Sequence, residues 1–274
     1  MLIKELERKA AAVRRQVLEM VVSANKGHIG GAFSCTDILV ALYYGGGLRC
    51  DALRPDRQDR DRFILSKGHS GIAQYVILAD LGFFPASELE TYGANRSMLG
   101  GHPDRNIPGI EADTGSLGHG LAIGAGIALG AKLDGKHHLS IVLLGDGECY
   151  EGSVWEAAMF ASHHRLGNLI AIVDRNRQCA TDFTESCCEM EPFAEKWRAF
   201  NWETVEVNGH CLEELLEVFS TLGHRESNKP LAIVAHTIKG KGATCMEKTV
   251  ECHHMVPEGE QLSAALEELA RGCR

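Results

Sequence analysis

The sequence lacks the features that mark membrane, secreted or nucleic-acid-binding proteins. No apolar run reaches the roughly 18 residues that a membrane-spanning helix needs, and the amino-terminal segment is charged and amphipathic, unlike a signal peptide. Basic residues are in the minority, with 28 Lys and Arg against 37 Asp and Glu and a formal net charge of −9. We therefore expect a cytoplasmic protein that binds neither membranes nor nucleic acid. Local groups could still hold a small anionic ligand.

The chain also lacks any Cys-x-x-Cys pair, although it contains ten cysteines. One interpretation is a zinc site, because Cys187 adjoins Cys188 and Cys252 precedes His253 and His254. These groups do not have the spacing of zinc ligands. We favour reduced cysteines that act as small apolar side chains.

Nothing in the 274 residues indicates a repeat, a low-complexity tract or a linker, and the composition is that of a globular protein. Segments with helical apolar spacing alternate with short apolar runs typical of buried strands. We predict a single α/β domain over residues 1–274, doubly wound, with a mostly parallel sheet flanked by helices. A second predicted helix is capped by residues 34–37 and runs through residue 43. The other predicted helices are 3–24, 72–81, 121–133, 193–200, 212–222 and 260–270, and the predicted strands are 62–65, 140–144, 169–173, 204–207 and 230–237.

The two central strands each end in oxygen-bearing side chains. Strand 140–144 leads into Gly145-Asp146-Gly147, and the next strand ends just before Asn176, one βαβ unit later. Because neighbouring parallel strands end at the same edge of a sheet, Asp146 and Asn176 should lie close together. Glu151-Gly152 opens the intervening helix with free N–H groups, which suit a phosphate. Since Mg²⁺ prefers such oxygens together with phosphate, the pattern predicts a Mg²⁺-diphosphate site, although Gly-Asp-Gly alone also marks plain turns.

Histidines stand in several predicted glycine-rich loops. They are His28 after Gly27, His69 after Gly68, and His102 after Gly101. Each of them alone would more often be structural than catalytic. His69 is better placed than chance, because it follows strand 62–65 at the edge where open α/β sheets bind ligands.

Taken together, these motifs resemble those of the thiamine diphosphate enzymes, and of the transketolase family in particular. More narrowly, the chain resembles the amino-terminal subunit of a split, two-chain transketolase. The matching segments follow in family order over nearly the whole chain: 24–31, 60–69, 101–103, 114–118, 145–148 with 151–157, Asn176, and 236–242. The resemblance implies the thiamine diphosphate-binding fold.

The resemblance also implies roles for individual residues. Asp146, Asn176 and the backbone carbonyl of Gln178 would hold Mg²⁺. The expected contacts with thiamine diphosphate are His69, Leu117, Gly118, Gly147, Glu148 and Asn176. The expected catalytic residues are His28, His69, His102 and His253 around the sugar, with His254 as the neighbouring alternative to His253, and Glu151 as the carboxylate that links paired cofactor sites.

The activity that the resemblance implies is transfer of a two-carbon ketol unit from a ketose, a sugar phosphate or a related sugar, to an aldose. Full-length transketolases continue into a second α/β domain that holds the aminopyrimidine. This sequence ends at Arg274. We therefore expect a separate carboxyl-terminal, pyrimidine-binding partner subunit, in an α₂β₂ assembly.

Several positions depart from the family pattern, and we expect none of them to touch the predicted metal pair of Asp146 and Asn176. The departures are Lys26, Ile29, His119, Arg175, Arg177 and Cys252. They leave the identity of the sugar open. The alternatives are a 2-oxo acid dehydrogenase α subunit, which lacks the Ser-Lys-Gly-His and Gly-His-Pro segments, a deoxyxylulose-phosphate-synthase-like subunit, and a non-catalytic cofactor-binding homologue, against which the retained histidines argue.

Overall fold

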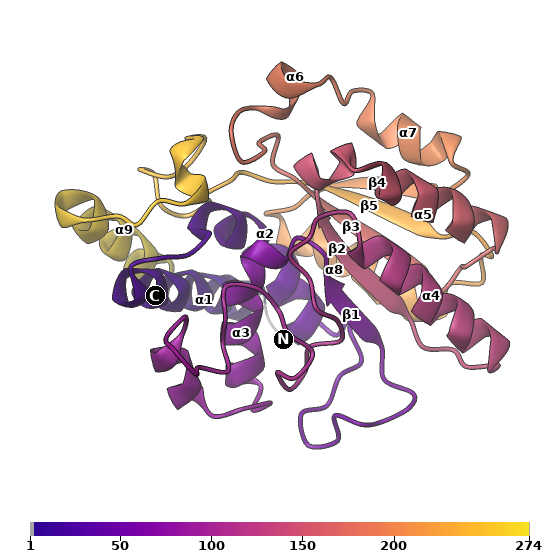
Figure 1. Ribbon diagram of the computed structural model, residues 1–274, viewed down its shortest axis with the longest axis horizontal. Helices are drawn as coiled ribbons and strands as arrows, with labels where there is room; N and C mark the ends of the chain where they lie inside the picture. The colour runs from indigo at the N-terminus through magenta and orange to yellow at the C-terminus, as the bar shows by residue number, and fades with distance from the viewer. Residues whose placement is uncertain (1–2, 274) are drawn as a thin grey trace.

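Five parallel strands form a single sheet in the computed structural model, which describes residues 3–273 (Figure 1). In spatial order the strands are β1 (Arg62–Leu65), β2 (Ser140–Gly145), β3 (Leu169–Arg175), β5 (Leu231–His236) and β4 (Glu203–Asn208). All four pairings are parallel. The predicted parallel α/β architecture is confirmed.

Helices cover both faces of this sheet (Figure 1). One face carries α1 (Ile3–Ala24), α2 (Ile29–Tyr44), α3 (Gly71–Asp80), α8 (Leu212–Thr221) and α9 (Gly259–Gly272). The other carries α4 (Gly120–Leu133), α5 (Gly152–His163) and α7 (Phe193–Ala199), and the single-turn helix α6 (Thr184–Cys187) lies in the loop after β3. Among residues 3–273 there is no helix both long and apolar enough to cross a membrane.

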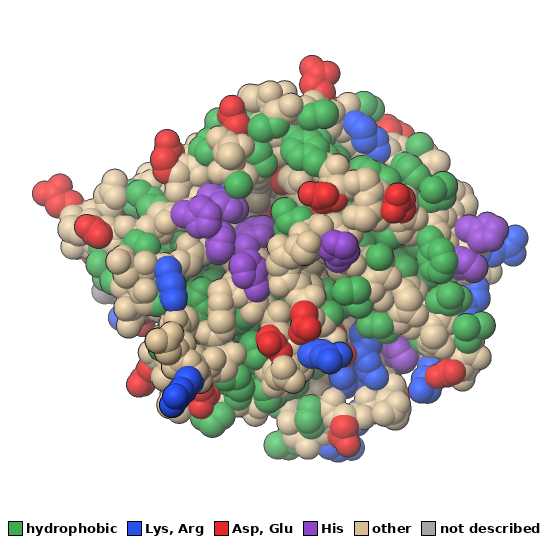
Figure 2. Space-filling view, in the orientation of Figure 1, with side chains coloured by type: hydrophobic (Ala, Val, Ile, Leu, Met, Phe, Trp, Pro, Cys, Tyr) green, Lys and Arg blue, Asp and Glu red, His purple; other side chains and the backbone are tan. Residues whose placement is uncertain are grey.

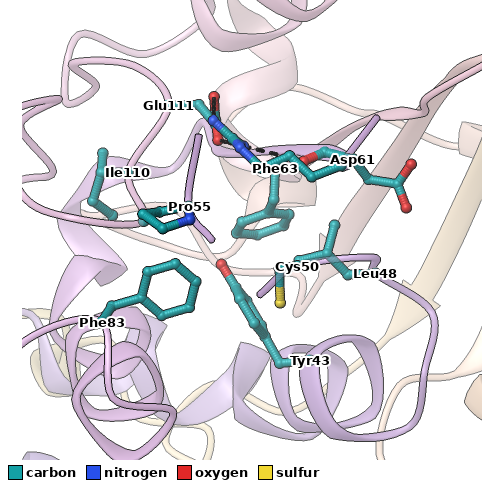
Figure 3. A pocket seen from close by; sticks show the side chains of 11 residues that line it. Tyr43, Leu48, Cys50, Pro55, Asp61, Phe63, Phe83, Ile110 and Glu111 are labelled. Carbon is teal, nitrogen blue, oxygen red and sulfur yellow. Dashed lines mark hydrogen bonds and ion pairs between the residues drawn. The ribbon is translucent and has the colours of Figure 1, made fainter. Parts of the chain in front are cut away.

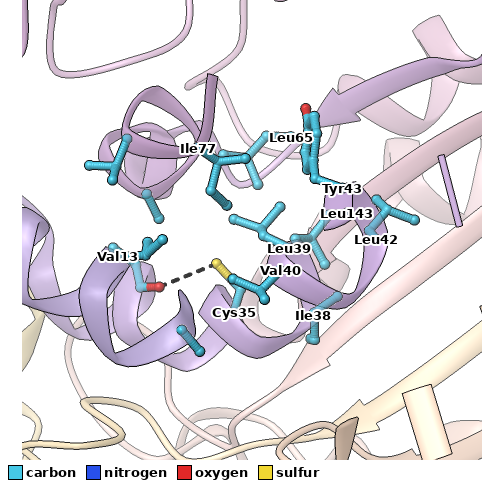
Figure 4. Close-up of a cluster of buried hydrophobic side chains, with 14 of the residues drawn as sticks. Val13, Cys35, Ile38, Leu39, Val40, Leu42, Tyr43, Leu65, Ile77 and Leu143 are labelled. Carbon is cyan, nitrogen blue, oxygen red and sulfur yellow. Dashed lines mark hydrogen bonds between the residues drawn. The ribbon is translucent and has the colours of Figure 1, made fainter. Parts of the chain in front are cut away.

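Two hydrophobic cores result, one on each side of the sheet. Along β2, Ile141 and Leu143 belong to the core around α2, whereas Val142 and Leu144 belong to the core under α4 and α5. A strand that is buried on both faces has a continuous apolar sequence, which explains the apolar run in the predicted strand 140–144. Figure 4 shows the larger core, where α2 is buried on nearly all sides. Such a helix is apolar on most of its sides, and its buried carboxylate, Asp37, is paired with Arg14.

The order of the strands explains why helices lie on both faces. The chain crosses from β2 to β3 through α5 and, in the opposite direction along the sheet, from β4 to β5 through α8. Because such crossovers are almost always right-handed, crossings in opposite directions place their helices on opposite faces. Because the strands are all parallel, they end at the same edge of the sheet, where a ligand site is expected.

The prediction for the start of the second helix was wrong. Residues 34–37 do not cap it; the helix begins at Ile29, directly after His28. Gly30 and Gly31, which we expected in the glycine-rich loop around His28, lie in its first turn, and neighbouring side chains approach both of them closely. A Cβ on Gly30 would lie 2.5 Å from the Sγ of Cys252, and one on Gly31 would lie 2.9 Å from the Oγ of Ser70.

A buried ion pair joins two strand ends at the same edge. The ammonium of Lys67, just after β1, donates to the carboxylate of Asp174 in β3, and both side chains are at most 1% exposed. Asp174 also accepts hydrogen bonds from Ser34 in α2 and Thr237 after β5. Burial alone would raise the pKa of Asp174, but Lys67 and these hydrogen bonds hold that pKa below its ordinary value. The carboxylate is therefore charged and fully paired.

We expect Lys67→Ala to lower the free energy of unfolding by about 3–5 kcal/mol, because it leaves the Asp174 charge buried without its partner. Urea unfolding followed by circular dichroism measures this. The control is Lys9→Ala, which removes an ion pair with Asp80 whose side chains are 31% and 43% exposed, and should cost no more than about 1 kcal/mol. Equal losses in the two variants would show that the buried pair does not stabilise the strand ends.

Candidate functional site

A pocket of about 480 Å³ opens where the strands end. It is lined by all the predicted site residues except two: His28, His69, His102, Leu117, Asp146, Gly147, Glu148, Asn176, Gln178 and His253. Figure 2 shows histidine side chains gathered at one place on this face of the molecule. Segments that are far apart in the sequence thus meet in one cavity, as the sequence predicted.

The two predicted residues outside the pocket lie beside it. Gly118 is buried behind the wall, where its N–H donates to Glu148 at 2.9 Å. A Cβ on Gly118 would lie 2.5 Å from Ser153 Oγ, and its φ of +86° favours glycine. Glu151 caps the amino end of α5 and its side chain is exposed. It is therefore free to meet another chain, and its predicted linking role stays a prediction.

Glu148 holds three loops together. Its carboxylate accepts hydrogen bonds from the Ser66 hydroxyl and from the N–H groups of Gly118 and Gly145. Burial raises its pKa, while these hydrogen bonds oppose the rise. The geometry supports a role in positioning the pocket wall, and the predicted contact with a cofactor stays a prediction.

Asp146 lies at the floor of the pocket, completely buried. Its carboxylate accepts hydrogen bonds from the N–H groups of Gly147 at 2.8 Å and Arg177 at 2.6 Å. Burial nevertheless raises the pKa of this carboxyl to about 6. The negative charge is therefore incompletely compensated by the protein, which favours a bound cation at this point.

Arg175 also contacts this carboxylate, at 3.1 Å, and was not expected to do so. Its guanidinium, fully buried, also pairs with Glu185 and Glu191 and stacks 5.1 Å from the ring of Phe193. The expectation that the departures from the family pattern leave the metal ligands untouched is thus wrong for Arg175. Because the guanidinium is divided among three carboxylates, Asp146 keeps part of its charge for another cation.

The other predicted metal ligands come from the loop after β3. Asn176 Nδ2 lies 3.3 Å from Ser34 Oγ and its Oδ1 accepts from the N–H of Gln178 at 3.0 Å. The buried Oε1 of Gln178 has no hydrogen-bond partner. Carboxylate, amide and carbonyl oxygens are the ligand types that Mg²⁺ prefers, so this group of residues fits a magnesium ion.

The four predicted histidines line another part of the same pocket. The ring of His28 lies 5.5 Å from that of His69, 5.7 Å from that of His102 and 5.3 Å from that of His253. They come from the start of α2, the turn after β1, the 101–103 loop and the loop before α9. No single stretch of sequence could have shown this grouping.

The three innermost imidazoles are held neutral. Burial, together with neighbouring positive groups, lowers the pKa of His28 to about 4 and that of His253 to about 3. Burial, followed by the charge of Lys67, also lowers the pKa of His69 well below its ordinary value. A neutral imidazole can both donate and accept a proton. Near pH 7 this wall is therefore suited to proton exchange with hydroxyl and carbonyl oxygens.

Two lysines of the pocket were not predicted from the sequence. Lys67 lines it while pairing with Asp174, and Lys239, which follows β5, donates from Nζ to the Cys179 carbonyl at 2.7 Å. Burial lowers the pKa of Lys239. These cations suit an anionic ligand in a chain whose net charge is negative. The sequence feature that could have identified them is a lysine shortly after each of two apolar strand segments.

A smaller pocket on the same molecule has a structural explanation. It holds only about 50 Å³ and is lined by the ion pair of Arg60 with Glu111, by Tyr43 and by Phe63 (Figure 3). Its charged groups all have partners, because Arg60 pairs with Glu111 and Asp61 pairs with Arg49. We therefore place the functional site in the larger pocket.

Comparison with known proteins agrees with this geometry. Residues 6–269 match the family described as transketolase, thiamine diphosphate binding domain. The chain belongs to the transketolase family. The relatives include one of the subunits of the apulose-4-phosphate transketolase of Phocaeicola vulgatus, 41% identical over 98% of this chain and 95% of the relative. Another belongs to the 6-deoxy-6-sulfo-D-fructose transketolase of a Clostridium species, also as one of its subunits, and is 38% identical over 97% of each chain.

The fold of the transketolases is confirmed as well. The crystal structure of transketolase from Campylobacter jejuni superposes with a TM-score of 0.91 at 30% identity, covering 98% of this chain but 43% of that transketolase. The chain thus spans under half of that transketolase but nearly all of the two relatives named as subunits. The predicted membership among split transketolases is confirmed, and neither the dehydrogenase, the synthase nor the non-catalytic alternative is favoured.

The neutral histidines predict how stability depends on pH. Below about pH 6.5 the unfolded chain takes up protons on His28 and His253, whereas the folded chain does not until about pH 4 and 3. The unfolded state then binds more protons, so the free energy of unfolding must fall as pH falls from 7 to 5. Replacing both histidines by glutamine should lower this slope, because up to about two fewer protons are taken up on unfolding.

Urea unfolding at intervals between pH 7 and 5 measures the two slopes. Asp146, whose pKa is raised, contributes with the opposite sign, but equally in both proteins. A control with the exposed His163 and His224 replaced by glutamine should keep the parent slope. Parallel curves for the parent and the His28, His253 double variant would show that these histidines are not held neutral.

Proposed function

We propose that residues 1–274 form the diphosphate- and metal-binding half of a two-chain, thiamine diphosphate-dependent transketolase. This half would serve the transfer of a two-carbon ketol unit from a ketose to an aldose. The observation that carries the proposal is the single pocket in which the Asp146 and Asn176 oxygens face four histidines. Metal and sugar chemistry require these two groups side by side.

Each end of the pocket has its own task in this proposal. Asp146, Asn176 and the Gln178 carbonyl would hold Mg²⁺, and Gly147, His69 and Lys239 would hold the diphosphate at the same edge. Bound thiamine diphosphate supplies the electron sink for carbon–carbon bond cleavage and formation. Leu117 and Gly118 would define the wall beside its rings.

The histidines would handle the protons of the sugar. His28 and His102 would exchange a proton with the carbonyl or alkoxide oxygen, and His69 and His253 would stabilise charge nearer the cofactor. Positioned general acids and bases contribute about 10²–10⁴-fold to a rate. The low pKa values of His28 and His253 keep both rings neutral throughout the physiological range.

A partner chain would complete the site. The two relatives described above are named as subunits, and both are matched over almost their full length. Helices α4 and α5 leave large apolar side chains exposed, namely Ile123, Leu133, Met159 and Phe160. Contiguous exposed apolar surface marks protein interfaces. We propose an α₂β₂ assembly in the cytoplasm, with Glu151 at the contact between cofactor sites.

The substrate class follows from the same relatives. Their names give a sugar phosphate in one case and a sulfonated sugar in the other. We propose that the sugar of this chain likewise carries an anionic group at its far end. Lys26, two residues before His28, is one of the altered positions, and its ammonium donates to the Gly93 carbonyl.

Asp146→Asn should weaken binding of Mg²⁺-thiamine diphosphate by at least about thirtyfold, equivalent to about 2 kcal/mol. Asparagine keeps the shape of the side chain but removes the negative charge that the metal needs. Calorimetric titration of the cofactor into the reconstituted two-chain assembly, with excess Mg²⁺, measures the effect. Asp134→Asn, at the exposed carboxyl end of α4, is the control. Parent-like affinity in Asp146→Asn would refute the assignment of the metal site.

A further inference from the structure

The imidazole of His254, which has no role in the proposal above, lies beside those of His28 and His253. One ring nitrogen from each of His28, His253 and His254 lies within 4.8 Å of the others. Among the side chains of residues 3–273, this is the one set of three or more histidine, cysteine, aspartate or glutamate groups with that convergence. We propose that these histidines bind a transition-metal dication, with Zn²⁺ the best match, separately from the Mg²⁺ site.

The fold fixes the relative positions of these rings. His28 directly precedes α2, and His253 and His254 follow the buried Cys252 in the loop before α9. The Cys252 main chain and sulfur pack against Gly30, where a Cβ would lie only 2.5 Å from Sγ. The first turn of α2 and the 251–253 turn are thus held together. The rings of His28 and His254 lie 4.4 Å apart, and those of His253 and His254 lie 4.6 Å apart.

The rings are also in the chemical state that a metal requires. The pKa values of His28 and His253 are lowered, so both rings are neutral at pH 7, and only neutral imidazole binds a metal ion. The buried Nδ1 atoms of both rings have no hydrogen-bond partner in the protein. An unpaired buried polar atom is costly, and these atoms belong to two of the three rings that would bind the ion.

The surroundings select the kind of ion. The converging ligand atoms are three imidazole nitrogens, with no carboxylate among them. Ca²⁺ and Mg²⁺ need oxygen ligands and are disfavoured here. Imidazole suits Zn²⁺, Cu²⁺ and Ni²⁺, and three protein ligands leave the fourth tetrahedral position of Zn²⁺ for water or an anion.

Occupation of this site has a consequence that rests on the proposed function. His28 and His253 are the rings assigned to the sugar and cofactor, so a metal ion on them would exclude the sugar. Zn²⁺ should then inhibit ketol transfer competitively with the sugar. His254 has no assigned part in the reaction, so its replacement should relieve the inhibition without removing a residue that the reaction uses.

The test measures metal binding without any activity. The full chain, saturated with Mg²⁺ to fill the Asp146 site, is titrated with Co²⁺, which gives intense visible absorption when it is four-coordinate. We expect one equivalent of such absorption, removed by added Zn²⁺. His254→Ala, which alters an exposed ring, should weaken Co²⁺ binding at least about tenfold, since loss of even an outer-shell partner costs 10–100-fold. His28→Ala should do the same.

The control variant is His224→Ala, an exposed histidine outside the pocket, which should bind Co²⁺ like the parent. Equal Co²⁺ affinity in the parent and His254→Ala would overturn the proposal. So would a weak spectrum of the six-coordinate type that excess Mg²⁺ abolishes, because it would place the ion on the Asp146 oxygens. Neither result depends on whether the reconstituted enzyme is a transketolase.

Discussion

The carboxylate of Asp174 is the point on which the arrangement of the pocket depends. It is fully buried at the end of β3 and accepts hydrogen bonds from Ser34 in α2, Lys67 after β1 and Thr237 after β5. Such a group is stable only when every partner is in place. Satisfying one carboxylate therefore fixes three strand ends and a helix relative to one another. His69 follows β1, Asn176 and Gln178 follow β3, and His28 directly precedes the helix.

Much of this arrangement could be predicted from the sequence. Continuous apolar runs marked the central strands, and the parallel order placed Asp146 and Asn176 at neighbouring ends, as the pairing of Gly145 with Asp174 confirms. Local patterns sufficed here because strands and crossovers obey short-range rules. The histidine loops could be grouped only through resemblance to a family, because nothing in a single loop says which other loops it will meet.

The features that escaped prediction depend on contacts between distant segments. α2 begins at Ile29, and its second residue, Gly30, packs against Cys252, more than 200 residues away. Arg175 reaches Asp146 because two glutamates of the following loop hold its guanidinium. The meeting of His254 with His28 has the same cause. Sequence spacing argued against a zinc site at Cys252-His253-His254, and the fold replaces the cysteine with a histidine from another segment.

Reconstitution with a partner chain tests most directly the claim that this chain forms half of an active site. The measurement is ketol transfer from a ketose to an aldose, with thiamine diphosphate and Mg²⁺ present, as the proposed partner chain is titrated into a fixed amount of this protein. We expect no turnover without the partner and a rate that rises until the two chains are equimolar. Turnover by this chain alone, or none with the partner in excess, would contradict the claim.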